Sequence, residues 1–209
     1  MLRDPILAAG LTTSALVSTV MMTTLVVGPF HLSRSLHLHP AYVGLVMSAG
    51  PAVSALTGVP AGRATDRFGT GTMVVVGLGG VIGGSVALSL MPAAAGVAGY
   101  VLPLVATTAS YALFQAANNT AVMKDVAPHQ RGLVSGMLNL SRNLGLITGA
   151  SVMGAVFTVA AGTSDITTAV PEQVARGTHR TFAVAALLVA IGLAVVLGLR
   201  VRSRPAAGH

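Results

Sequence analysis

Amide and guanidinium side chains recur at helical spacing in two long apolar stretches of the chain. They are Gln115, Asn118, Asn119, Asn139 and Arg142. Such groups bind polar partners through hydrogen bonds. Because they are costly in contact with lipid, we expect them to line a hydrated cavity between helices. Hydrogen bonds that only join one helix to the next are the alternative.

Arg142 lies eleven residues after Arg131, a distance of ~16 Å along a helix axis. If a helix begins at Arg131, the guanidinium lies deep in the apolar layer and faces a cavity or a carboxylate. If the helix begins later, the side chain reaches back to the interface instead. The sequence is compatible with both arrangements.

Catalytic and metal-binding patterns are not visible in the sequence. The chain has no cysteine, and the pair His37 and His39 has no third ligand at a recognisable spacing. A Ser-His-Asp arrangement and a phosphate-binding glycine loop are also missing. We therefore predict no enzyme, no metal site and no cofactor. The remaining histidines, His31 among them, lie near the ends of apolar stretches, where we expect them to be solvated.

The acidic residues all lie outside the apolar stretches. They are Asp4, Asp66, Asp125, Asp165 and Glu172. Proton coupling in membrane carriers normally uses a carboxylate inside the membrane. If the parent protein is a proton-coupled carrier, its coupling carboxylate is expected in another part of a longer polypeptide.

The composition excludes an ordinary soluble domain. Of the 209 residues, 53% are hydrophobic and 8% are charged, and the mean hydropathy is +0.80, whereas soluble domains have about 25% charged residues. The net charge of +7 comes from basic residues scattered singly at the ends of apolar stretches. That pattern does not match a nucleic-acid-binding surface, which gathers its charge on one face. The expected partner is a lipid bilayer.

Six stretches are long and apolar enough to cross a membrane as helices. They cover residues 5–31, 40–61, 72–91, 98–123, 132–160 and 179–200. The third and sixth carry almost no polar group, so we expect these two to face lipid and the other four to line a central cavity. The pattern predicts an all-α membrane protein, in which residues 1–209 form one bundle of two three-helix inverted-repeat units.

Basic residues collect in alternate connections between these stretches. One side has Arg3, Arg63, Arg67, Lys124, Arg131, Arg200, Arg202 and Arg204, whereas the other side has Arg34, Arg176 and Arg180. Lys and Arg concentrate in cytoplasmic loops of membrane proteins. Both termini are therefore predicted to lie in the cytoplasm, with the chain in a bacterial plasma membrane.

A compact charged segment, "GRATDRFG", joins the second and third stretches. Its candidate functional residues are Gly62, Arg63, Asp66, Arg67 and Gly69. The glycines permit a sharp turn, and a carboxylate near the start of the next helix suits the positive end of its dipole. A tight turn with positive-inside charges and no further role is the alternative.

This segment resembles the cytoplasmic loop signature of the major facilitator superfamily. The resemblance implies a latch that breaks when a carrier changes state, although Thr70 and Gly71 stand where further basic residues usually follow. A second segment, "VAPHQRGLVSGMLNLSRNLGLITGASVMG" over 126–154, resembles the 14-helix drug:proton antiporter branch. Its matching residues include Arg131 and Arg142. Four of its glycines have the small-xxx-small spacing of close helix packing: Gly132, Gly136, Gly145 and Gly149.

The resemblance covers nearly the whole chain, but only as the C-terminal half of such a carrier. It implies multidrug efflux by alternating access, with small hydrophobic or cationic substrates and a role in antibiotic resistance. A complementary N-terminal half, or a second copy of the chain, would complete the pathway. The alternative is a decayed carrier that acts as a membrane scaffold without transporting anything.

Overall fold

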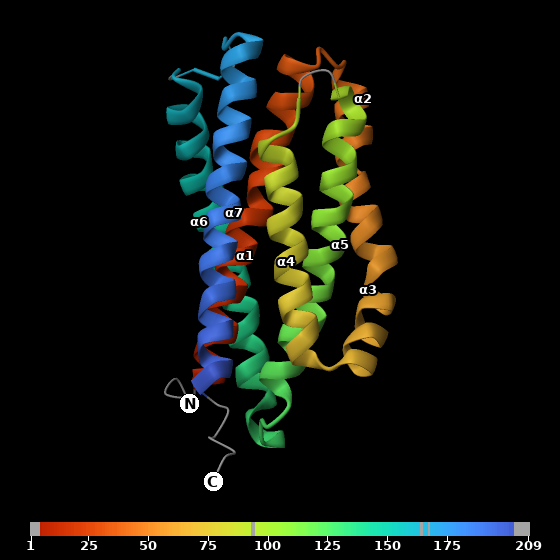
Figure 1. The fold of residues 1–209 in the computed structure, drawn as a ribbon, viewed down its shortest axis with the longest axis vertical. Helices are drawn as coiled ribbons and strands as arrows, with labels where there is room; N and C mark the ends of the chain where they lie inside the picture. The colour runs from red at the N-terminus through yellow and green to blue at the C-terminus, as the bar shows by residue number, and fades with distance from the viewer. Residues whose placement is uncertain (1–4, 93–94, 164, 167, 203–209) are drawn as a thin grey trace.

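The computed structural model describes residues 5–92, 95–163, 165–166 and 168–202. These residues form helices and no β-strand. The elements are α1 (Pro5–Phe30), the π-helix η1 (His31–Ser35), α2 (Pro40–Met47), α3 (Ala49–Phe68), α4 (Thr70–Ser89), α5 (Gly96–Met123), the short 3-10 helix η3 (Pro128–Gln130), α6 (Arg131–Ala161) and α7 (Pro171–Arg202). Figure 1 shows the long helices side by side along the long axis of the molecule.

Six segments within the described residues are long and apolar enough to span a membrane. The first combines α1 with η1, and the second combines α2 with α3. The prediction of an all-α membrane protein with six spans is therefore confirmed. The start of α1, the end of α7, the α3–α4 joint and the α5–α6 connection all lie at one end of the bundle (Figure 1).

The connection between the second and third spans is much shorter than the sequence predicts. We expected a polar break between residues 61 and 72, but α3 continues to Phe68 and α4 begins at Thr70. Gly69 alone joins them, with φ 84° and ψ 142°. A residue with a side chain is strained at that φ. The charged segment is therefore the last two turns of a helix, with a one-residue corner after it.

Two other boundaries differ from the prediction. The second span is interrupted at Ser48, because the ring of Pro51 lacks the N–H that would bind the carbonyl of Met47. The last helix begins at Pro171, eight residues before the predicted start at 179. Proline in the first turn and Glu172 beside it stabilise a helix N-terminus, so this polar segment is helical although it is not apolar.

The packed helix pairs follow a repeating pattern. Five principal pairs are α1–α6, α1–α7, α3–α5, α4–α5 and α4–α7. A sixth pair, α6–α7, is an exception to the pattern, because the equivalent pair α3–α4 packs much less extensively. If the first three spans are exchanged in order with the last three, α1–α6 becomes α5–α3 and α1–α7 becomes α5–α4. The pair α4–α7 is unchanged by this exchange. This correspondence is the one expected of two three-helix units related by an inverted repeat.

Burial is uneven across the bundle. The main core surrounds large buried side chains such as Tyr100, Phe114, Phe157 and Phe182. A second, smaller cluster joins α1, α5 and α6 at the end where α5 meets α6, and consists of Leu7, Val122, Val134 and Leu138. In α3 only Ala61 and Thr65 are buried. One side of the bundle is thus left uncovered along α3.

The four glycines of α6 that were predicted to pack against a neighbour divide into two pairs. A Cβ atom at Gly145 would lie 2.9 Å from backbone atoms of Ala15, and one at Gly149 would lie 2.7 Å from the carbonyl oxygen of Thr19. These two glycines allow α1 and α6 to touch. A Cβ atom at Gly132 or Gly136 would meet no other atom within 4 Å, because these two glycines lie on the side of α6 that faces away from α1.

We expect Gly145→Ala to destabilise the protein by about 1–3 kcal/mol, because the added methyl group forces the backbones of α1 and α6 apart. The measurement is an unfolding titration in detergent, followed by circular dichroism. Gly136→Ala is the matched control on the same helix, and its unfolding midpoint should stay at or above that of the parent. Equal midpoints for the two variants would contradict the close α1–α6 contact.

Candidate functional site

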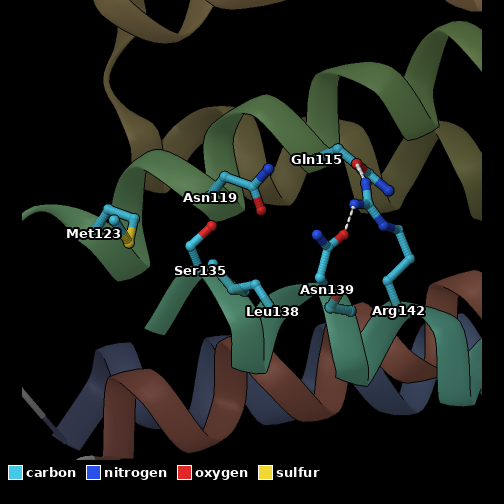
Figure 2. A pocket seen from close by; sticks show the side chains of 8 residues that line it. Gln115, Asn119, Met123, Ser135, Leu138, Asn139 and Arg142 are labelled. Atoms are coloured by element: carbon cyan, nitrogen blue, oxygen red, sulfur yellow. Dashed lines mark hydrogen bonds between the residues drawn. The ribbon is translucent and has the colours of Figure 1, made fainter. Parts of the chain in front are cut away.

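The polar side chains that recur at helical spacing on α5 and on α6 meet in the structure. Arg142 on α6 donates from Nη1 to Oε1 of Gln115 on α5 at 2.8 Å, and from Nη2 to Oδ1 of Asn139 one turn earlier on its own helix. Figure 2 shows the guanidinium extending across the gap between the two helices toward Gln115. Two neutral amide oxygens therefore hold the charged group.

The hydrogen bonds continue from Gln115 to a third helix. The amide nitrogen of Gln115 donates to the hydroxyl of Tyr111, which lies 3.4 Å from Oγ of Ser18 on α1. Because Gln115 uses its oxygen for Arg142 and its nitrogen for Tyr111, its side chain has one favourable orientation. The network links α6, α5 and α1.

The structure also decides between the two arrangements of Arg142. Helix α6 begins at Arg131, so Arg142 lies ~16 Å along the helix from its first residue. Its half-buried side chain points across to Gln115 and does not extend back toward the end of the helix. Within the described residues, no carboxylate contacts the guanidinium.

A cavity of about 140 Å³ surrounds this network. The side chains that line it come from α1, α5 and α6: Ser14, Gln115, Asn119, Met123, Ser135, Leu138, Asn139 and Arg142. Asn119, Ser135 and Asn139 are exposed, so the cavity opens to the outside along one side. Ser135 and Asn119 face each other across it (Figure 2). Helices α2 and α3 contribute no lining residue, although the sequence predicted that the second span would also line the cavity.

Asn118 has a different place from the other predicted cavity residues. It is only 5% exposed, and its Nδ2 donates to the carbonyl oxygen of Gly10 on α1 at 3.2 Å. The side chain therefore joins two helices and does not line the cavity. Thr108, ten residues earlier on α5, is also buried, and its hydroxyl donates to the carbonyl oxygen of Leu104 on its own helix.

The predicted gating segment lies at the end of the bundle where α3 meets α4. Arg63, Asp66 and Arg67 are exposed there. The guanidinium of Arg67 lies 5.3 Å from the ring centroid of Phe68, a cation–π contact at the negative end of α3. The N-cap residue of α4 is Gly69, and it makes no side-chain cap hydrogen bond. A latch role for this segment remains a prediction.

The family of the chain is shown by its first 150 residues. The family described as Major Facilitator Superfamily matches residues 1–150, which is more than half of the 209 residues. The chain belongs to the major facilitator superfamily. Its six apolar helices and its cavity at the α5–α6 contact are therefore features of a member of this superfamily.

Curated relatives are transporters from several bacteria. The chain is 27% identical over 201 residues to the uncharacterized transporter YebQ of Escherichia coli, which covers 96% of the chain and 41% of YebQ. It is 28% identical over 128 residues to the multidrug efflux pump LfrA of Mycolicibacterium smegmatis, covering 61% of the chain and 25% of LfrA. It is 25% identical over 129 residues to the riboflavin transporter RibZ of Clostridioides difficile, covering 62% of the chain and 28% of RibZ. The chain thus spans less than half the length of each of these relatives.

Sequence patterns missed a buried histidine of this superfamily member. We expected His31 to be solvated, but it is 3% exposed, and neither ring nitrogen has a hydrogen-bond partner among the described residues. Its ring stacks on Tyr100 with the centroids 5.7 Å apart. Hydropathy could have indicated this burial, because His31 directly follows an apolar stretch and η1 extends that helix by more than a turn.

His39, a member of the His37 and His39 pair, caps the N-terminus of α2. Its Nδ1 accepts a hydrogen bond from the amide of Ala41 at 3.4 Å.

Hydroxyl groups that cross-link helices were also missed. Ser141 donates to the carbonyl oxygen of Leu11 at 2.5 Å, and Thr19 donates to that of Gly145 at 3.0 Å. Both bonds join α1 to α6 beside the close glycine contact. A serine or threonine in a helix usually bonds to its own backbone, so nothing in the sequence distinguishes these two.

We expect Asn118→Ala to destabilise the protein by about 0.6–1.5 kcal/mol, because it removes the bond between α5 and α1. Asn119→Ala should change stability by less than about 0.5 kcal/mol, because Asn119 is exposed beside the cavity. The two variants are matched in chemistry and adjacent in sequence. Detergent unfolding titrations followed by circular dichroism measure both. A larger loss for Asn119→Ala would show that the two roles are reversed.

Proposed function

We propose that the chain is the C-terminal six-helix half of a secondary transporter of the 14-helix drug:proton antiporter branch. It exports small hydrophobic compounds by alternating access, and in this way contributes to multidrug efflux and antibiotic resistance. The similarity to LfrA, a multidrug efflux pump, supports this export function. The similarity to RibZ, a riboflavin transporter, favours organic substrates of moderate size.

The observation that carries the proposal is the polar cavity between α5 and α6. A guanidinium and several amides line it, and the guanidinium belongs to Arg142, which lies ~16 Å along α6 from its first residue. Polar groups inside a membrane face the bundle interior or a water-filled path. A transporter needs such a path, whereas a passive scaffold does not.

The open side of this cavity indicates that a complementary half covers it. Asn119, Ser135 and Asn139 are exposed there, and an amide that faces lipid is costly. We therefore propose that a second six-helix unit, either an N-terminal half or a second copy of the chain, covers this side. Substrate then moves between the units as they rock against each other. The exposed apolar side chains of α3 and α6, such as Leu56 and Ile147, suit that contact.

The distribution of basic residues supports an orientation with both termini in the cytoplasm of a bacterial cell. Arg63, Arg67, Lys124 and Arg131 lie near the end of the bundle that holds the start of α1 and the end of α7. Arg34, Arg176 and Arg180 lie toward the opposite end. The first group is the richer in charge once the basic residues at the two termini are included, as the positive-inside rule requires.

The α3–α4 corner is the proposed cytoplasmic latch. Gly69 fixes the corner, and Arg63, Asp66 and Arg67 on the last turns of α3 are exposed and available to a neighbouring unit. A decayed carrier that serves as a scaffold is the competing function. It predicts that Asp66→Asn and Arg142→Ala leave any cellular phenotype unchanged.

Efflux of Nile red, a neutral hydrophobic dye, tests the transport function. Cells that express the chain together with the N-terminal half of a superfamily carrier should accumulate less dye than cells with either half alone. Arg142→Ala in the paired system should reduce the initial efflux rate at least about tenfold, because it removes the hydrogen bonds to Gln115 and Asn139 that hold the cavity together. Arg131→Ala is the matched control at the exposed start of α6 and should retain most of the rate.

Efflux by the chain alone would contradict the need for a complementary half. Unchanged efflux in the Arg142→Ala variant would contradict the role of the cavity. Absence of efflux in every combination, with both halves present in the membrane, would favour the scaffold.

A further inference from the structure

The charge of the cavity is positive and is not balanced by the helices that form it. Of the eight lining residues, Arg142 is the one with an ionisable side chain. Its two described partners, Gln115 and Asn139, are neutral amides. Neutral acceptors satisfy some of its five N–H groups, but they do not cancel its charge.

Among the residues that the structure describes, no charged side chain other than Arg142 lines the cavity. The nearest acidic residue along α5 is Asp125, which follows the end of that helix and lies ~15 Å beyond Gln115. Lys124 stands directly before it, so the pair adds no net negative charge. The remaining acidic residues lie outside the apolar stretches of the sequence. A positive cavity inside a membrane attracts an anion and repels a cation.

The cavity within this six-helix unit is small. Sites for whole drug-sized molecules usually measure about 300–1,000 Å³, whereas this cavity measures about 140 Å³. It is therefore large enough for a head group, and the rest of a larger ligand would lie against the proposed complementary unit. The groups around the guanidinium offer further donors for an anion, because Ser14, Asn119 and Ser135 make no side-chain hydrogen bond within the described residues.

The geometry points to an organic anion as the substrate class, with its carboxylate or a similar oxyanion bound by Arg142. This inference rests on the proposed transport function and refines it. The sequence predicted hydrophobic or cationic substrates, whereas the charge of the cavity disfavours the cationic ones. Arg142 acts as the group that selects the charge of the substrate, because its planar fork matches the geometry of a carboxylate.

Three ligands of the same shape and different charge test this inference. They are 4-fluorobenzoate, 4-fluorobenzamide and 4-fluorobenzamidine, which are anionic, neutral and cationic at pH 7. Fluorine NMR line broadening measures their binding to the purified chain in phosphatidylcholine nanodiscs, with empty nanodiscs as the blank. The parent chain should bind the benzoate at least about tenfold more tightly than the benzamidine.

Variants at one position separate charge from folding. Arg142→Gln should lower the affinity for 4-fluorobenzoate at least about tenfold and leave that for 4-fluorobenzamide within about twofold. Arg142→Lys should retain the preference for the anion, with lower affinity because the bidentate fork is lost. Arg131→Gln is the matched control outside the cavity and should bind the benzoate like the parent. Circular dichroism confirms that each variant is folded.

Two results would overturn the inference. One is a parent chain that binds the benzamidine as tightly as the benzoate, or binds neither. The other is an Arg142→Gln variant that keeps the affinity for the benzoate. If the paired halves export Nile red but the chain shows no preference for the anion, the transport function stands and the anion inference is wrong. If the chain prefers the anion but the paired halves export no Nile red, the anion site stands and the transport function is wrong.

Discussion

A guanidinium that lies within a membrane-spanning bundle must find its hydrogen-bond partners in the protein, because lipid offers none. In this chain Gln115 and Asn139 meet that need for Arg142. The bond from Arg142 to Gln115 joins α6 to α5, and the contacts of Gln115 with Tyr111 and of Tyr111 with Ser18 extend the network to α1. The same helices are held from the other side by the contact of Gly145 with Ala15. Close packing and a satisfied polar network thus act on the same three helices, and the cavity lies between them.

The arrangement explains why the polar residues occupy the fourth and fifth spans and the third and sixth are apolar. Helices α4 and α7 pack on each other and on α5 and α1, and they have no part in the cavity. Helices α3 and α6 flank the α1–α5 pair in equivalent positions and leave one side of the bundle uncovered. A six-helix unit with a polar cavity opening on an uncovered side is suited to work against a second unit. The chain also spans less than half the length of its curated relatives.

Hydropathy predicted the number and class of the helices, because a span of ~20 apolar residues is dictated by bilayer thickness. It did not predict that α3 would continue through Arg63 and Asp66, since charged residues at the end of a helix look like a loop. The helical spacing of the polar residues predicted that Gln115 and Arg142 face a cavity between helices. It did not separate Asn118 from Asn119, because adjacent residues differ by ~100° around a helix, and the position of a neighbouring helix decides which one is buried. Tertiary contacts of that kind are absent from the sequence of one chain.

The central claim is that water reaches the α5–α6 cavity while the opposite faces of the bundle contact lipid. The chain has no cysteine, so single cysteines can be introduced without background. Asn139→Cys and Ile191→Cys, the second on the exposed apolar face of α7, would be treated in membranes with a water-soluble maleimide that requires a thiolate. The account predicts rapid labelling at position 139 and no labelling at position 191 until detergent is added. Labelling of both at similar rates, or of position 191 alone, would contradict it.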